Sequence, residues 1–128
     1  MNALDISFTS AELATLEHEL EQLIGFVNES MSSRNDISEL IGNSSIDMMR
    51  DNHRNSARFI LTSASIGDFG KLEETMPWVY ATYHNHGFFF RYFAVVFKTW
   101  IQAIHKLIDP PLADKYASVY EWLFEHHR

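Results

Sequence analysis

The sequence predicts an all-helical protein that folds as a single domain over residues 1–128. The run Phe88–Ile108 contains no glycine or proline, which is typical of a long helix. Apolar residues recur at three- and four-residue steps in most other segments, and no segment has the alternation of a convincing strand. A chain of 128 residues and 14.9 kDa is long enough to bury one core of its own.

The run Phe88–Ile108 is expected to be the central helix of about six. Apolar side chains cover most of its circumference, and its only formal charges are Arg91, Lys98 and Lys106. A helix that is apolar on most sides needs neighbours on several sides. The run is long enough to span a bilayer, but burying its charged and polar residues in lipid would be costly. We therefore expect a cytoplasmic protein with no membrane partner.

The first helix is predicted from a capping box. Thr9 and Glu12 have the required spacing, and leucines then follow at helical steps until the pattern fades near Ser30. Glutamates occupy the other faces, so this helix should lie on the outside of the bundle.

The next two helices are separated by a polar loop. Residues 28–45 are rich in serine and asparagine, and we expect there a short helix capped by Asp36 and stopped by Gly42. A third helix should follow from about 45 to 66. Its apolar stripe carries one polar residue, His53.

The remaining helices are delimited by proline and glycine. The segment 69–86 should be kinked at Pro77 or split there into two pieces, because proline removes a backbone donor and clashes with the preceding turn. Gly87 is expected to end it. After the central helix, Asp109 and two prolines open the last one.

Charge and composition exclude several classes of function. The net charge of −7 and a pI near 5.4 argue against nucleic acid and anionic membranes as partners. The chain has no cysteine, which excludes disulfides and thiolate chemistry. It also lacks the serine-hydrolase, zinc-protease and phosphate-loop motifs. We expect a protein that is not an enzyme.

Histidines and aromatic residues are the remaining candidates for a site. His53 is either hydrogen-bonded within the core or faces a ligand pocket. His84 and His86 end a helix at a spacing that does not bring both rings to one face, so they are a weak metal signal. The dense aromatic residues between 78 and 100 form either a large core, a pocket for a flat hydrophobic ligand, or a helix face that docks a partner.

The order of these segments resembles that of the bacterial sensor globins. The resemblance centres on 80–108, where a helix ending in histidine and glycine passes into an aromatic-rich helix with Tyr92 and Phe93. It implies His84 as a haem-iron ligand and His53 on the opposite side of the haem. Related globin-like domains without haem serve as regulatory modules. A fainter similarity, carried by Trp78-Val79-Tyr80, Gly87 and Tyr92-Phe93, is to the helical modules that precede cobalamin-binding domains in bacterial regulators.

Together these observations predict a globin-like, non-catalytic sensory or regulatory domain, with haem as a candidate cofactor. It would bind a hydrophobic ligand or a signalling partner, or form a homodimer. The expected ligand contacts are His53, Trp78, Tyr83, Phe93 and Phe97, with His84 on the metal. The alternatives are a cofactor-free interaction or dimerisation module and a helical module of a cobalamin-type regulator. An open cavity beside Phe93 and Phe97 favours the sensor, and a closed core favours the interaction module.

Overall fold

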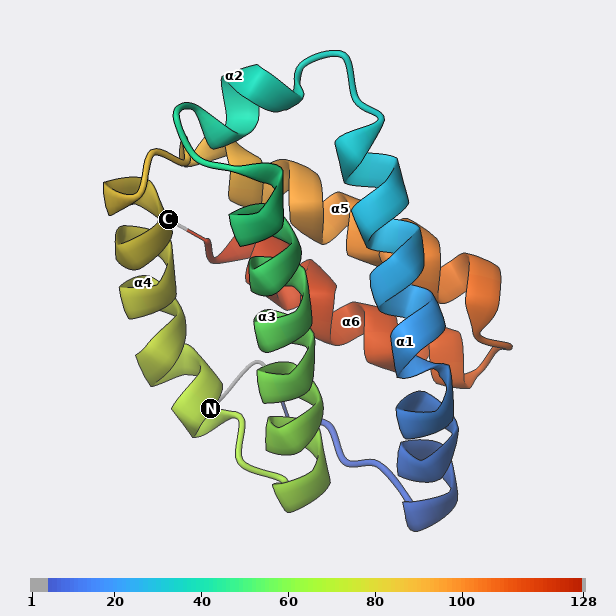
Figure 1. The fold of residues 1–128 in the computed structure, drawn as a ribbon. Coiled ribbons are helices and arrows are strands. Elements are labelled where there is room, and N and C mark those ends of the chain that lie inside the picture. Colours follow the sequence, from blue (N-terminus) through green and yellow to red (C-terminus); the bar gives the residue numbers. More distant parts are fainter. Residues whose placement is uncertain (1–4, 128) are drawn as a thin grey trace.

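Six helices make up the fold in the computed structural model, which describes residues 5–127 (Figure 1). They are α1 (Ser10–Ser32), α2 (Ile37–Ile41), α3 (Ile46–Ile66), α4 (Gly70–Asn85), α5 (Arg91–Leu107) and α6 (Leu112–Glu125). The described residues contain no strand. The predictions of an all-helical fold and of about six helices are confirmed. None of the helices described is long and apolar enough to cross a membrane.

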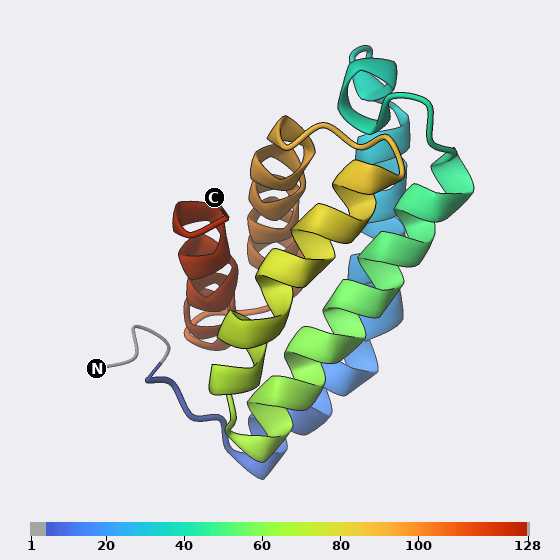
Figure 2. The same cartoon turned by 90° about the vertical axis from the view of Figure 1, so that its left-hand side faces the viewer.

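Helix α5 lies between α6 and α1, and α3 packs on the far side of α1 (Figures 1 and 2). Helix α4 contacts α3, and its Tyr80 packs edge-on against Phe93 of α5 with ring centroids 4.7 Å apart. The core therefore lies among α1, α3, α4, α5 and α6, and α6 adds the buried Tyr116 and Tyr120 to it. The backbones of α3 and α4 approach each other closely at only a few positions. The two helices therefore leave an open groove between them along part of their length.

Most helix ends lie at the capping residues that the sequence predicts. Thr9 accepts a hydrogen bond from the Glu12 amide, and the Glu12 carboxylate accepts one from the Thr9 amide, which completes the capping box. Ser45 caps α3, and Gly67 ends it in the left-handed conformation. Pro77 lies inside α4, which continues as one helix past it.

The central helix begins at Arg91 and not at Phe88, which corrects the predicted range. The Phe89 amide donates at 2.9 Å to the carbonyl of Leu40 in α2, and not to a carbonyl of its own helix. Phe88 is buried, whereas Phe89 and Phe90 are exposed. The three phenylalanines therefore form a turn whose conformation is set by contact with α2, a partner that the local sequence does not reveal.

Two glycines bring this turn against the loop after α2. Gly42 has φ 58° and ψ −127°, and a Cβ atom at this position would lie 2.2 Å from the carbonyl oxygen of Gly87. Gly87 itself has φ 108°, a conformation that side chains disfavour. The close approach of these two backbones fixes how Phe89 and Phe90 are presented.

The side chain of Asp36 does not cap α2, which corrects the prediction from the sequence. It forms ion pairs instead. Its carboxylate accepts from Arg34 at 2.8 and 3.0 Å and from Arg91 at 3.1 Å. The two hydrogen bonds from Arg34, followed by the one from Arg91, lower the pKa of Asp36 to about 2. The ion pair ties α2 to the first residue of α5.

Candidate functional site

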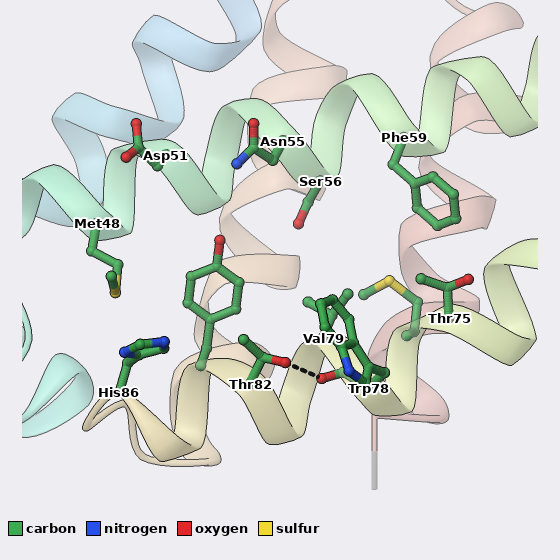
Figure 3. A pocket seen from close by; sticks show the side chains of 12 residues that line it. Met48, Asp51, Asn55, Ser56, Phe59, Thr75, Trp78, Val79, Thr82 and His86 are labelled. Carbon is green, nitrogen blue, oxygen red and sulfur yellow. Dashed lines mark hydrogen bonds between the residues drawn. The ribbon is translucent and has the colours of Figure 1, made fainter.

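A groove runs between α3 and α4 and has a volume of about 420 Å³ (Figure 3). We call it the α3–α4 groove. It is lined by Met48, Asp51, Asn55, Ser56, Phe59, Thr75, Met76, Trp78, Val79, Thr82, Tyr83 and His86. Its volume lies within the range of about 300–1,000 Å³ that is usual for ligand pockets.

The two walls of the α3–α4 groove differ in chemistry. The α4 wall is largely apolar and aromatic, and Trp78 on it is 69% exposed. The α3 wall adds polar side chains beside Met48 and Phe59. Asp51 is the only residue in the lining with a formal charge. The groove can thus receive an apolar surface and pair with a positive charge at its edge.

A buried polar chain leads from the core to the floor of the groove. The Tyr92 hydroxyl donates to Asn52 Oδ1 at 2.7 Å, and Asn52 Nδ2 donates to Ser56 Oγ at 3.2 Å. Burial raises the pKa of Tyr92 well above its ordinary value, so the phenol stays a donor. Ser56 points from α3 toward α4 (Figure 3). Because its oxygen accepts from Asn52, its own proton is free to face the groove.

The charges of α4 are confined to Lys71, Glu73 and Glu74 near its start, and the rest of the helix and the turn after it carry none. Residues 75–90 include no aspartate, glutamate, lysine or arginine, although the chain as a whole carries −7. Three of the four large hydrophobic side chains that are exposed among the described residues lie here: Trp78, Phe89 and Phe90. Exposed aromatic residues without neighbouring charges are typical of protein-binding surfaces.

Two of the predicted ligand contacts, Trp78 and Tyr83, line this groove together. Phe93 and Phe97 do not. They are buried in the core, 6.3 Å apart between ring centroids, and Tyr80 packs edge-on against both. The core beside them is closed, which is the arrangement that favours an interaction module.

His53 is fully buried and belongs to the core. Its Nδ1 donates to the side-chain oxygen of Asn28 at 2.7 Å, and its ring is parallel to Tyr92 with centroids 6.4 Å apart. Nε2 is buried without a partner among the described residues. Burial, with a smaller contribution from the charge of Arg50, lowers the pKa of His53 to about 3. None of the grooves described here is lined by His53.

His84 lies on the surface, on a different side of α4 from the groove. Its Nδ1 donates to the Phe88 carbonyl at 2.9 Å, and its ring stacks on Phe90 with centroids 4.0 Å apart. His84 is thus exposed while His53 is enclosed, and neither lines the two grooves beside α4. With one ring enclosed in the core and the other on the surface, these two side chains do not fit a haem held between them. No cluster of three or more metal-ligating side chains occurs in the described part of the chain.

The α3 side of the groove was not anticipated from the sequence. The stripe through Met49, His53 and Ala57 indicates the core face correctly, but Met48 and Phe59 lie on another face. Their spacing of eleven residues, three turns of a helix, is the signal that could have marked a second apolar face.

Comparisons of the chain with protein-family models, curated proteins and solved structures give no match.

Proposed function

We propose that this protein is a non-catalytic regulatory domain that docks an amphipathic helix of a partner protein in the α3–α4 groove. The observation that supports this most strongly is the uncharged surface of residues 75–90, which carries an exposed Trp78 beside a long groove. Tryptophan is enriched among the residues that contribute most to binding energy, and lysine and glutamate are depleted from interface centres.

The length of the groove fits a short helix. Along α3 it extends from Met48 to Phe59, which is about 16 Å at a rise of about 1.5 Å per residue. This span corresponds to about three turns, enough for the i, i+3, i+4 and i+7 anchors by which amphipathic helices dock in grooves. The methionines in the lining, Met48 and Met76, are side chains that adapt to an incoming apolar surface.

The charge of the site selects the polar face of the partner helix. Asp51 is the only formal charge in the lining, and the protein carries −7 overall. A helix with lysine or arginine beside its apolar stripe is attracted by both, whereas an acidic helix is repelled.

Two synthetic helical peptides test the proposal. They share one apolar stripe and differ in carrying lysines or glutamates on the polar face. Calorimetric titration should show binding of the lysine peptide only. Trp78→Ala should weaken that binding at least tenfold, because truncation of a central aromatic anchor costs about 2 kcal/mol or more.

Phe89→Ala is the matched control, since Phe89 is also an exposed aromatic residue of the uncharged surface but does not line the groove. It should leave the affinity for the lysine peptide within about twofold of the original. Equal losses for the two variants, or no binding of either peptide, would contradict the proposal.

A further inference from the structure

A second groove lies on the opposite flank of α4, where the turn before α5 and His127, two residues past the end of α6, approach it. We call it the α4–α5 groove. Its volume is about 590 Å³, and it is lined by Pro77, Tyr80, Ala81, Phe90, Arg91 and His127. It shares no lining residue with the α3–α4 groove.

The walls of the α4–α5 groove are flat and held in place. Tyr80 is fixed by edge contacts to Phe93 and Phe97. Phe90 is half-exposed, and the ring of His84, itself fixed by the Phe88 carbonyl, stacks on it. His84 thus acts as a positioning residue for Phe90. Walls of aromatic rings and proline suit a flat aromatic ligand.

The charge in this groove has the opposite sign to that of the protein. Of the described residues that line it, Arg91 carries the only formal charge, His127 adds an imidazole, and none supplies a carboxylate. Arg91 shares Asp36 with Arg34, which already contacts both carboxylate oxygens. One carboxylate cannot neutralise two guanidinium groups, so a positive charge remains beside the aromatic walls.

From this geometry we propose that the α4–α5 groove binds a small aromatic carboxylate. The ring lies against Tyr80 and Phe90, and the carboxylate accepts hydrogen bonds from the Arg91 guanidinium, whose planar fork matches two carboxylate oxygens. A neutral ring gains only the apolar contacts, and a cationic one meets Arg91 with like charge. This site is independent of the docking of a partner helix on the other side of α4.

The test uses 2-naphthoate, with 2-naphthamide and naphthalen-2-ylmethylammonium as the neutral and cationic analogues of the same ring. Calorimetric titration of the full chain should give one 2-naphthoate site, at least tenfold weaker binding of the amide and no binding of the cation. A hydrogen-bonded charge contributes enough for a tenfold effect or more.

Arg91→Gln should weaken 2-naphthoate binding about tenfold or more. Arg58→Gln is the matched control, because Arg58 is likewise the second arginine on one carboxylate, that of Glu21, and lines neither groove. It should leave the affinity unchanged. Equal affinities for 2-naphthoate and 2-naphthamide, equal effects of the two arginine variants, or no binding at all would overturn the proposal.

A second variant fills the groove without removing a charge. Ala81 is exposed on α4 and lines the site, so Ala81→Leu keeps a good helix former while placing a larger side chain between the walls. It should abolish 2-naphthoate binding while the circular dichroism and the unfolding midpoint stay unchanged. Full binding by this folded variant would place the ligand elsewhere and contradict the proposal.

Discussion

The two grooves beside α4 share one helix and differ in the charge at their edges. The α3–α4 groove has a single carboxylate, Asp51, whereas the α4–α5 groove has Arg91 and His127 and no carboxylate. Both lie against the same uncharged stretch, residues 75–90. The apolar surface of α4 thus supplies contact area on both sides. The charged residues of the neighbouring segments determine which ligand charge each groove favours.

We expect the largest loss of stability when the Gly42–Gly87 contact is disrupted. This contact holds the turn that forms one wall of the α4–α5 groove. In Gly42→Ala the new methyl group would meet the Gly87 carbonyl oxygen at 2.2 Å, in a backbone conformation that alanine disfavours. We expect a loss of about 2–4 kcal/mol in the free energy of unfolding.

Chemical denaturation measures this loss, and Gly25→Ala is its control. Gly25 lies inside α1 with no atom close to an added Cβ, so this change should stabilise the protein by about 0.5–1 kcal/mol. If both variants were equally stable, the close approach of the two turns would not hold the groove wall.

Buried His53 contrasts with both surface grooves and should make stability depend on pH. Its pKa is about 3 in the folded protein and near 6.5 when unfolded, so between these values the unfolded chain binds the extra proton. The stabilisation is complete above pH 6.5 and is lost as the pH falls toward 3. From pH 7 to pH 5.5 we expect a loss of about 1.3 kcal/mol, before the carboxylates titrate.

Denaturation at the two pH values, with His53→Gln and His18→Gln compared, checks this assignment. His18 is exposed on α1, so its replacement should leave the pH dependence as it is. His53→Gln should remove most of it. A slope that survives in His53→Gln would show that another group carries the linkage.

Local sequence patterns predicted the helices well because their ends depend on near neighbours. Thr9 and Ser45 cap through amides only three residues away, and Gly67 ends α3 by its own backbone conformation. The start of α5 was misplaced because the Phe89 amide bonds to Leu40, far away in sequence. Asp36 failed as a side-chain cap for the same reason, since its carboxylate pairs with Arg91 as well as with Arg34.

The candidate sites were predicted only in part. An aromatic helix face suggested Trp78 and Tyr83, and both line the α3–α4 groove. The pairing of His53 with His84 across a haem did not follow from their separation along the chain, because one ring turns into the core and the other onto Phe90. The α4–α5 groove had no local signal, since His127 joins the other lining residues only through the packing of α6.

The hydrogen-bonded chain beneath the α3–α4 groove should respond to removal of the Tyr92 hydroxyl. Tyr92→Phe leaves the buried oxygen of Asn52 without its donor, at a cost of about 1–3 kcal/mol in the free energy of unfolding. Tyr83→Phe should change it by less than about 0.5 kcal/mol, because that half-buried hydroxyl makes no hydrogen bond with the described residues. Thermal or chemical denaturation of the two variants measures this difference. Equal stabilities of Tyr92→Phe and Tyr83→Phe would mean that the hydrogen bond from Tyr92 to Asn52 does not stabilise the fold.

Asp51→Asn should give the smallest effect and sharpen the contrast between the grooves. An exposed ion pair contributes about 0–1 kcal/mol, so the lysine peptide should bind up to about fivefold more weakly. Binding of 2-naphthoate should be unchanged, because Asp51 does not line the α4–α5 groove. Calorimetric titration of both ligands into this variant checks the two expectations. An equal loss of affinity for the peptide and for 2-naphthoate would mean that the charge of Asp51 acts on both grooves alike.

The most direct test of two separate sites of opposite charge preference is to map amide chemical shifts while each ligand is added. We predict that the lysine peptide shifts the amide signals of Ser56 and Phe59 in α3, and that 2-naphthoate shifts those of Phe90 and Arg91 at the start of α5. With the peptide at saturation, 2-naphthoate should still produce its own set of shifts. If both ligands moved the same residues, or if the peptide blocked 2-naphthoate, α4 would carry one undivided apolar surface and the account would be contradicted.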